Sequence, residues 1–359
     1  MKIVNVITTI ELGGAEVQLL QTTKNLRAHG IDVSVVFLKG QLDLYREFSE
    51  IGCELINLSG LSLIRQTRFL RRFTVRQEQS IVHAHLSRSE LLTYIATLFT
   101  KVSFVITRHN SEPFWPNAPR IISSFLSRLI LNKASRVIVI SKAVLEFLVS
   151  SKEIRVDLLQ KVCLIYYGFS DSKKALKRAK DSYKIVTVGT IARLEAQKDL
   201  GTLLKAVSRL TKVCDVRLDI VGEGSQKTNL ENLSREIGIK GVTRFLGKTT
   251  EIEKFLSSLD VFVLPSKYEG FGAVLVEAMK VGVPIVASNT SSIPEVLGED
   301  YIGLCVVGDD EDFARTIFDA INPSYRNRFT RGYRKRLSFF KAELTARKHI
   351  SIYNSVLGR

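Results

Sequence analysis

Lys2-Ile-Val-Asn-Val-Ile-Thr8 opens the chain with a run rich in β-branched residues, and Gly13-Gly14 follow it as a turn. Ala15–His29 then carries apolar residues at helical spacing, and Gly30 is suited to end a helix. A second β-rich run, Asp32–Leu38, comes directly afterwards. This order predicts a strand, a helix and a second parallel strand, the βαβ unit from which parallel sheets are built.

Similar β-rich runs, separated by stretches long enough for helices, continue along the first half of the chain. They are Glu54–Leu58, Ile81–His85, Phe104–Thr107 and Arg136–Ile140. A parallel sheet with helices on both faces accommodates this alternation. The apolar periodicity stops around Asp171–Ser182, and a second series of strands and helices begins at Lys184–Val188. We therefore predict an α/β fold with two Rossmann-like domains, residues 1–170 and 183–336, joined by a linker at residues 171–182.

The composition is that of an ordinary globular protein. The 359 residues are 45% hydrophobic and 25% charged, which excludes a disordered chain and a small disulfide-stabilised domain. The longest apolar runs are far shorter than the roughly 20 residues of a spanning helix, so we expect no membrane-spanning helix. Met1–Ile10 lacks the pattern of a signal peptide, so we expect no signal peptide either. The cysteines are far apart in the sequence, which favours free thiols and a cytoplasmic location: Cys53, Cys163, Cys214 and Cys305.

The charge is less ordinary, because 52 Lys and Arg against 36 Asp and Glu leave a net charge of +16. Such a charge attracts phosphate in nucleic acid, in an anionic membrane surface or in a phosphorylated small molecule. The basic residues are spread over both halves and are not interleaved with aromatic residues in a nucleic-acid-binding pattern. We therefore expect no nucleic-acid partner.

The most informative stretch is Pro265-Ser-Lys-Tyr-Glu-Gly-Phe-Gly-Ala-Val-Leu-Val-Glu-Ala-Met279, which follows a predicted strand and opens a predicted helix. Backbone N–H groups at such a helix start bind anions at the carboxyl edge of a parallel sheet. Glu269 lies just before the helix and Glu277 inside it, so the two carboxylates are suited to different parts of one ligand. Carboxylates accept paired hydrogen bonds from vicinal hydroxyls, which sugars offer. The alternative is that both are ordinary helix-terminal and solvated acids.

Two further stretches point to a phosphate ligand. In Val188-Gly-Thr-Ile-Ala-Arg-Leu-Glu-Ala-Gln-Lys198, a guanidinium and an ammonium group follow the end of a predicted strand. Arg193 suits bidentate contact with a diphosphate, and Lys198 suits a point-charge contact. Near the start, Gly13 and Gly14 allow a ligand to approach the backbone closely. Taken alone, the charges also fit a solvated loop.

Together these motifs resemble the GT-B retaining glycosyltransferases of family 4 over residues 3 to about 300. The resemblance rests on the order of the motifs: Gly13-Gly-Ala-Glu16, Arg193, Lys198, Val221-Gly-Glu-Gly224, Glu269 and Glu277 around Glu-Gly-Phe-Gly, and Ile293-Pro-Glu295. It implies two Rossmann-like domains that face each other across a cleft, with the acceptor bound by the first and the nucleotide-sugar donor by the second. It also implies that residues 337–359 form a helical region that crosses back to the first domain.

The resemblance assigns roles to individual residues. Arg193 and Lys198 correspond to the residues that hold the donor diphosphate, Glu277 to the one that holds the ribose, and Glu269 to the one that holds the transferred sugar. His109, in Thr107-Arg-His-Asn110, corresponds to a histidine that faces the reacting sugar, and we expect His109, Glu269, Arg193 and Lys198 to form the catalytic set. The remaining donor-binding positions are Gly14, Gly222, Gly270, Phe271 and Gly272.

The same resemblance implies the chemistry. The family transfers a sugar with retention of anomeric configuration, without a covalent enzyme intermediate and generally without a metal, so we expect no metal and no cofactor. The donor is expected to be a UDP- or GDP-sugar and the acceptor a glycan or lipid-linked glycan of cell-surface polysaccharide or lipopolysaccharide synthesis. Two positions depart from the family pattern: Asp199 replaces a frequent glycine, and Tyr166-Tyr-Gly-Phe-Ser170 replaces a frequent Tyr-Asn-Gly motif.

Three other functions remain open at this point. The first is a zinc site, because His83, His85 and His109 have a plausible ligand spacing. A GT-B nucleotide-sugar epimerase or phosphorylase shares the nucleotide-site logic. A basic nucleic-acid-binding protein is the last alternative, given the net charge.

A basic stretch, Leu61–Phe73, predicts contact with an anionic membrane surface. As a helix it places Leu63, Leu70 and Phe73 near one face, with Arg65, Arg68, Arg71 and Arg72 beside or opposite it. The alternative is a solvated helix that packs on the sheet of its own domain and contacts no membrane. With the net charge and the family resemblance, we predict peripheral attachment to the inner face of the cytoplasmic membrane.

Overall fold

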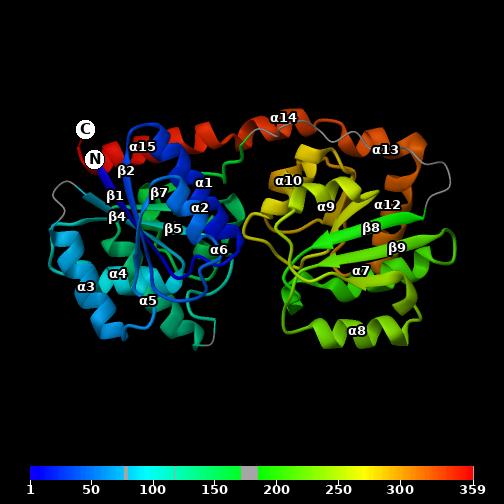
Figure 1. Ribbon diagram of the computed structural model, residues 1–359, viewed down its shortest axis with the longest axis horizontal. Coiled ribbons are helices and arrows are strands. Elements are labelled where there is room, and N and C mark those ends of the chain that lie inside the picture. The colour runs from blue at the N-terminus through cyan, green and yellow to red at the C-terminus, as the bar shows by residue number, and fades with distance from the viewer. Residues whose placement is uncertain (77–79, 117, 171–184, 359) are drawn as a thin grey trace. The chain divides into compact units, whose positions relative to one another are not determined.

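The computed structural model describes residues 1–76, 80–116, 118–170 and 185–358, and the chain divides into two compact units. Unit 1 combines Met1–Ser170 with Phe340–Arg359, and unit 2 is Asp171–Phe339 (Figure 1). The expected linker at residues 171–182 lies outside the described residues. Each unit is a parallel α/β domain, as the alternation of strands and helices predicts.

In the described part of unit 1, seven strands form one parallel sheet in the order β3-β2-β1-β4-β5-β6-β7. Their bounds are Lys2–Ile7 (β1), Asp32–Phe37 (β2), Glu54–Asn57 (β3), Ser80–His85 (β4), Ser103–Arg108 (β5), Arg136–Val139 (β6) and Val162–Leu164 (β7). The register pairs Ile7 with His85, and His85 with Thr107. The carboxyl ends of β1, β4 and β5 therefore meet at one edge of the sheet.

Helices cover both faces of this sheet, since alternate strand residues point to opposite sides. Ile3 and Ile7 of β1 belong to a core that includes residues of α1, α2 and α15, whereas Val4 and Val6 belong to a core formed with α3 and α4. The helices of unit 1 are α1 (Gly14–Ala28), α2 (Tyr45–Glu50), α3 (Leu63–Val75), α4 (Ser87–Thr97), α5 (Arg120–Lys133), α6 (Lys142–Ser150) and α15 (Ala342–Val356). Helix α15 packs against α1, which explains why the C-terminal segment belongs to unit 1.

Unit 2 has a second parallel sheet, in the order β10-β9-β8-β11-β12-β13. The bounds are Val186–Ile191 (β8), Val216–Val221 (β9), Thr243–Phe245 (β10), Val261–Leu264 (β11), Ile285–Ser288 (β12) and Leu304–Cys305 (β13). The helices are α7 (Leu200–Leu210), α8 (Lys227–Glu236), α9 (Ile252–Ser258), α10 (Ala273–Val281), α11 (Ile293–Leu297), α12 (Asp310–Ile321), α13 (Pro323–Thr330) and α14 (Tyr333–Leu337). Leu203, Leu204 and Val207 of α7 and Phe313 of α12 are fully buried in its core.

One strand differs from the sequence-based expectation for a physical reason. The stretch Lys184–Val188 predicts a strand that ends at Gly189, but β8 runs on to Ile191. Gly189 is needed inside the strand because a Cβ atom there would lie only 2.4 Å from a methyl group of Leu259. Close packing, and not a turn, accounts for this glycine.

The described residues include no helix that is both long enough and apolar enough to cross a bilayer.

Candidate active site

Four buried histidines gather at the carboxyl edge of unit 1. His83 and His85 end β4, His109 follows β5, and His349 comes from α15. The ring of His83 contacts Tyr353 Oη through Nδ1 at 2.8 Å and Thr107 Oγ1 through Nε2 at 2.7 Å. All four histidines line one small pocket of unit 1. The structure thus brings His109 together with His85 and adds His349, which no sequence motif indicated.

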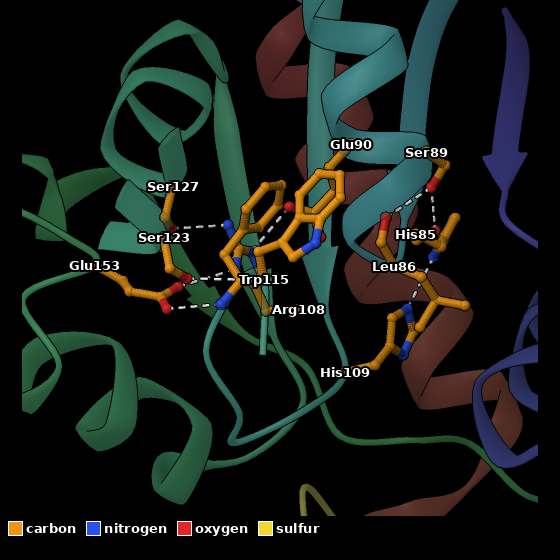
Figure 2. A network of polar contacts seen from close by, with 11 residues as sticks. His85, Leu86, Ser89, Glu90, Arg108, His109, Trp115, Ser123, Ser127 and Glu153 are labelled. Carbon is orange, nitrogen blue, oxygen red and sulfur yellow. Dashed lines mark hydrogen bonds and ion pairs between the residues drawn. The ribbon is translucent and has the colours of Figure 1, made fainter. Parts of the chain in front are cut away.

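A chain of hydrogen bonds fixes the ring of His109. Its Nε2 lies 3.1 Å from His85 Nδ1, and its Nδ1 lies 2.7 Å from Tyr167 Oη. His85 Nε2 in turn lies 3.1 Å from Asn5 Oδ1 (His85 and His109 in Figure 2). If Asn5 Oδ1 accepts from His85, then His85 Nδ1 accepts from His109 Nε2–H, and His109 Nδ1 accepts from the Tyr167 hydroxyl. One tautomer of His109 therefore satisfies the whole chain.

Burial keeps these rings neutral. It lowers the pKa of His109 to about 3, the pKa of His349 to about 4, and the pKa of His85 well below its usual range. Burial also raises the pKa of the Tyr167 hydroxyl, so that this group stays a hydrogen-bond donor. The histidine cluster at the edge of unit 1 is therefore polar, uncharged and internally hydrogen-bonded.

A buried ion cluster holds the loop that carries His109. Arg108, the last residue of β5, pairs with Glu90 at 3.0 Å and with Glu153 at 3.2 Å. The other oxygen of Glu153 accepts a hydrogen bond of 2.8 Å from the backbone N–H of Phe114 in the loop (Figure 2). Burial raises the pKa of Glu90 to about 7, against the opposing effect of Arg108. The only sequence signal for this cluster was a charged residue at the end of an apolar strand.

In unit 2, the expected catalytic residues Lys198 and Glu269 are in direct contact. Lys198 Nζ lies 2.5 Å from Glu269 Oε1, and only 12% and 8% of the two side chains are exposed. Ser266 Oγ donates to the same Glu269 oxygen at 2.7 Å. The sequence suggested contacts with different parts of a ligand, and in the structure the ammonium and carboxylate groups lie together at the carboxyl edge.

Arg193 lies on the loop after β8, as does Lys198, but it is exposed to solvent. Its guanidinium donates to Gln197 Oε1 at 3.3 Å. The backbone carbonyl of Gln197 accepts from Lys267 N at 2.9 Å, which connects this loop to the loop that carries Glu269. Two cations and one carboxylate are thus assembled from the loops after β8 and β11.

Helix α10 begins beside Glu269 and carries Glu277. Gly272 precedes the helix with φ of +76°, a conformation that favours glycine, and Phe271 is buried before it. Glu277 is half-buried, and the loss of hydration raises its pKa to about 7, with Lys280 opposing and Glu253 adding to the shift. Gly270, Phe271 and Gly272 therefore lead into the helix as the sequence predicts.

The two remaining predicted glycines differ in their surroundings. At Gly222 a Cβ atom would lie 1.9 Å from the carbonyl oxygen of Ala192, so the residue is required by close packing of two loops. At Gly14, the first residue of α1, a Cβ atom would meet nothing within 4 Å. Gly14 leaves open space at the helix start in unit 1, whereas Gly222 packs against protein backbone.

The histidines that suggested zinc have other partners. Within the residues that the structure describes, no group of three or more His, Cys, Asp or Glu side chains is placed to hold a metal ion. Both ring nitrogens of His83, His85 and His109 lie within hydrogen-bond distance of Thr, Tyr, Asn or His side chains. This arrangement favours a hydrogen-bonded cluster over a zinc site.

Two family models match the chain. The model described as "Glycosyltransferase Family 4" matches residues 12–173, and the model described as "Glycosyl transferases group 1" matches residues 169–336. The boundary between the two models falls between unit 1 and unit 2.

Known relatives and structures agree with these models. A lipopolysaccharide core biosynthesis glycosyltransferase of Rhizobium meliloti is 31% identical over 171 residues, covering 47% of this chain and 49% of the relative. An N-acetylgalactosaminyltransferase of Campylobacter jejuni is 29% identical over 238 residues, covering 63% of this chain and 62% of the relative. The name of this relative includes a diphospho-undecaprenol-linked sugar as its substrate. The chain spans about half the length of the first curated relatives it matches.

The fold likeness extends over the whole chain. The structure of Anabaena HepE in complex with UDP and glucose superposes with a TM-score of 0.83 at 19% identity, covering 99% of this chain and 100% of HepE. At this identity the likeness concerns the fold. Together the two family models account for residues 12–336, and the chain belongs to the GT-B glycosyltransferases of the group 1 and family 4 type.

Proposed function

We propose that the chain is a retaining glycosyltransferase that moves a sugar from a UDP- or GDP-sugar to a glycan or lipid-linked acceptor. The observation that carries this proposal is the assembly of Lys198, Glu269 and Arg193 beside the start of α10. A diphosphate binds to cations and to the backbone N–H groups of a helix start, and sugar hydroxyls bind to a carboxylate. All three kinds of group lie at the carboxyl edge of unit 2.

The proposed chemistry follows from these charges. Departure of a nucleoside diphosphate builds negative charge on the leaving oxygen, and the positive charges of Lys198 and Arg193 stabilise it. In this role the two cations replace a divalent metal, so the reaction needs neither a metal nor a cofactor. Lys198 exchanges its contact with Glu269 for the diphosphate, and the freed carboxylate of Glu269 accepts from sugar hydroxyls. Glu277 accepts from the ribose.

His109 has a different part in this proposal. Its ring is neutral and both nitrogens are hydrogen-bonded inside unit 1, so it is poorly suited to act as a base. In this proposal it offers a neutral, hydrogen-bonded ring and takes no proton from the acceptor. This fits a retaining mechanism in which the acceptor attacks on the face that the diphosphate leaves and no enzyme side chain forms a covalent bond.

The names of the relatives support the proposed acceptor class. These names include lipopolysaccharide core biosynthesis, O-antigen biosynthesis and transfer to a diphospho-undecaprenol-linked sugar. The net charge of +16 supports peripheral attachment to the anionic inner face of the cytoplasmic membrane. We place the protein there, with its acceptor in the membrane and its donor in the cytoplasm.

Calorimetry with UDP, GDP and their sugars tests the donor site. The Glu277→Ala variant should bind the correct donor about 5- to 150-fold more weakly, because a lost contact to a charged group costs about 1–3 kcal/mol. Glu311→Ala is the matched control, since this glutamate lies on α12 with 78% of its side chain exposed. If Glu277→Ala binds every nucleotide sugar as well as the parent does, the donor-site assignment is wrong.

Product analysis tests the reaction itself. Incubation with donor should give sugar transfer only when an acceptor is present, and the product should keep the anomeric configuration of the donor. A changed sugar in the absence of acceptor would instead indicate an epimerase. Phosphate-dependent cleavage of a glycan would indicate a phosphorylase.

A further inference from the structure

Helix α5 carries its apolar side chains toward solvent. Ile121, Ile122, Phe125 and Leu129, here called the α5 patch, are 85%, 50%, 59% and 38% exposed. Their spacing places them within about 100° of one another around the helix. A helix that covers a sheet normally turns such a stripe inward.

The inward side of the first turns of α5 is polar. Ser123 and Ser127 are buried, and Ser127 Oγ accepts from the guanidinium of Arg108 at 2.9 Å. Ser123 Oγ accepts from the backbone N–H of Trp115 at 2.9 Å (Figure 2). Ser127 thus contacts the buried ion cluster around Arg108, and Ser123 contacts the preceding loop. In the last turn of α5 the apolar residues Ile130 and Leu131 are buried. The orientation of α5 is therefore fixed by specific contacts, and its apolar side stays outward.

The neighbouring helix α4 adds two exposed apolar residues to this surface. It buries Leu92 and Ala96 together with Thr93 and Thr97, while Ile95 is 42% exposed and Phe99, just after the helix, is 95% exposed. Phe99 has φ of +57°, so the backbone holds an aromatic residue in solvent at a conformational cost. Helix α4 packs against both α3 and α5, and the three helices lie side by side on unit 1 (Figure 1).

The three helices of this surface are strongly basic. The sequences of α3, α4 and α5 contain a single carboxylate, Glu90, and it is buried against Arg108. They contain eight cationic residues, Arg65, Arg68, Arg71, Arg72, Arg88, Arg120, Arg128 and Lys133. Apolar side chains that project among cations match a surface with negative headgroups above a hydrocarbon layer.

We propose that the α5 patch, with Ile95 and Phe99, inserts into the anionic face of a lipid bilayer while the arginines of α3 bind its headgroups. This inference rests on the membrane part of the proposed function and assigns it to a surface. The role of α3 is divided along its length. Leu70 is fully buried and Phe73 packs on the core, whereas Leu63 and Ile64 in the first turn are 52% and 65% exposed, so α3 supplies charge along its length and apolar side chains only at its start.

Vesicle binding followed by tryptophan fluorescence tests the proposal directly. Trp115 is the single tryptophan of the chain, is 44% exposed and is hydrogen-bonded to α5. Vesicles of phosphatidylglycerol and phosphatidylcholine should shift its emission to shorter wavelength. Lipids brominated in the acyl chains should quench it. Vesicles of phosphatidylcholine alone should bind weakly.

Three variants separate insertion from charge. The double variant I121S/F125S should lose on the order of tenfold or more in vesicle affinity, because two apolar side chains no longer insert. The matched control V213S/F318S removes two exposed apolar side chains from unit 2 and should bind like the parent. The variant R65S/R68S/R72S should bind more weakly mainly at low salt, where headgroup attraction is strongest.

The outcomes are distinct. Binding of the parent and of I121S/F125S to anionic vesicles with equal affinity, or no binding of the parent at low salt, overturns the proposal. A parent that sediments as a dimer while I121S/F125S sediments as a monomer also overturns it, because a second copy then covers the patch. Calorimetry of nucleotide sugars with I121S/F125S should match the parent. A failure of donor binding in both proteins counts against the proposed function and leaves the vesicle result interpretable.

Discussion

The carboxyl edges of the two sheets hold polar groups in opposite ways. In unit 1 the histidines are buried and neutral, and each ring nitrogen of His109 already has a hydrogen-bond partner. In unit 2 the edge keeps its charges, with Lys198 and Glu269 paired at 2.5 Å and Arg193 exposed beside them. At the edge of unit 1, the ring nitrogens of His109 have hydrogen-bond partners without a ligand. At the edge of unit 2, a charged ligand can compete for the ion pair of Lys198 and Glu269.

The contrast has a common physical origin in the cost of burying charge. A single buried ion is expensive, so a buried group either gives up its charge or finds a counter-ion. The histidines of unit 1 take the first course. Lys198 and Glu269 take the second course. Glu277 is an intermediate case, because burial raises its pKa to about 7 and the carboxyl is partly protonated near neutral pH. The two edges therefore respond differently to mutation and to pH.

The largest effect is expected from the loss of the cation in unit 2. Lys198→Ala removes the charge that stabilises the leaving group and leaves Glu269 without its counter-ion. We expect transfer to slow by about 10²–10³-fold, the range found for preorganised charge-stabilising groups. Lys205→Ala is the matched control, since Lys205 is exposed on α7. Thermal melts of both variants show whether the fold survives. If folded Lys198→Ala transfers sugar at the parental rate, the edge of unit 2 is not the reaction site.

A smaller effect on the reaction is expected from the edge of unit 1. His85→Phe keeps an aromatic ring but deprives His109 Nε2 and Asn5 Oδ1 of their partner. We expect transfer to fall by about tenfold and the free energy of unfolding to fall by about 2–3 kcal/mol, because buried polar atoms lose hydrogen bonds. His85→Gln, which keeps polar atoms, should recover part of both losses.

Nitrogen NMR of the parent checks the same contrast without a mutation. His83, His85, His109 and His349 should remain neutral between pH 5 and 8, because burial lowers the pKa of each. Only His29, the remaining histidine, should titrate in that range, and contact with the Asn25 carbonyl and Glu343 raises its pKa. A second histidine that titrates near pH 6.5 would contradict the picture of a neutral edge.

Glu277 gives a pH-dependent effect of intermediate size. Its pKa is about 7 in the folded chain against an ordinary value of 4.5, so the folded state binds this proton more tightly. The stability from the protonated carboxyl is present below pH 4.5 and is lost as pH rises through 7. Glu277→Gln should therefore be more stable than the parent at pH 8, by about 3 kcal/mol, and nearly equal to it near pH 4.5. Urea unfolding at both pH values measures the difference, and a gap that grows as pH falls would have the wrong sign.

Much of the fold could be predicted from the sequence because its signals are local. The run Lys2–Thr8 and the helix after Gly13-Gly14 became β1 and α1, and the helix predicted to begin within Pro265–Met279 became α10. The position of the candidate site residues at the edge of a sheet could also be predicted. They follow strands, and parallel strands bring their carboxyl ends to one edge.

What could not be predicted depends on contacts between distant residues. Arg108 meets Glu153 from 45 positions away, and Tyr353 reaches His83 across 270 positions. The direction of a helix face is equally non-local. In α3 the apolar residue Leu70 turns inward, whereas in α5 the serines turn inward because they bind the ion cluster and the neighbouring loop. Periodicity alone shows which residues share one face of a helix, but it does not show which face is buried.

The smallest effect is expected from one hydroxyl group in unit 1. Tyr167→Phe removes the donor to His109 Nδ1, which lies 2.7 Å away, and leaves a buried acceptor without that bond. We expect the free energy of unfolding to fall by about 1–2 kcal/mol, since the aromatic ring still fills its space. Tyr325→Phe is the control, because Tyr325 is 43% exposed in unit 2. Combining Tyr167→Phe with His85→Phe should cost less than the sum of the two, because both act on one ring. Strictly additive losses would show that His109 is not held between the two residues.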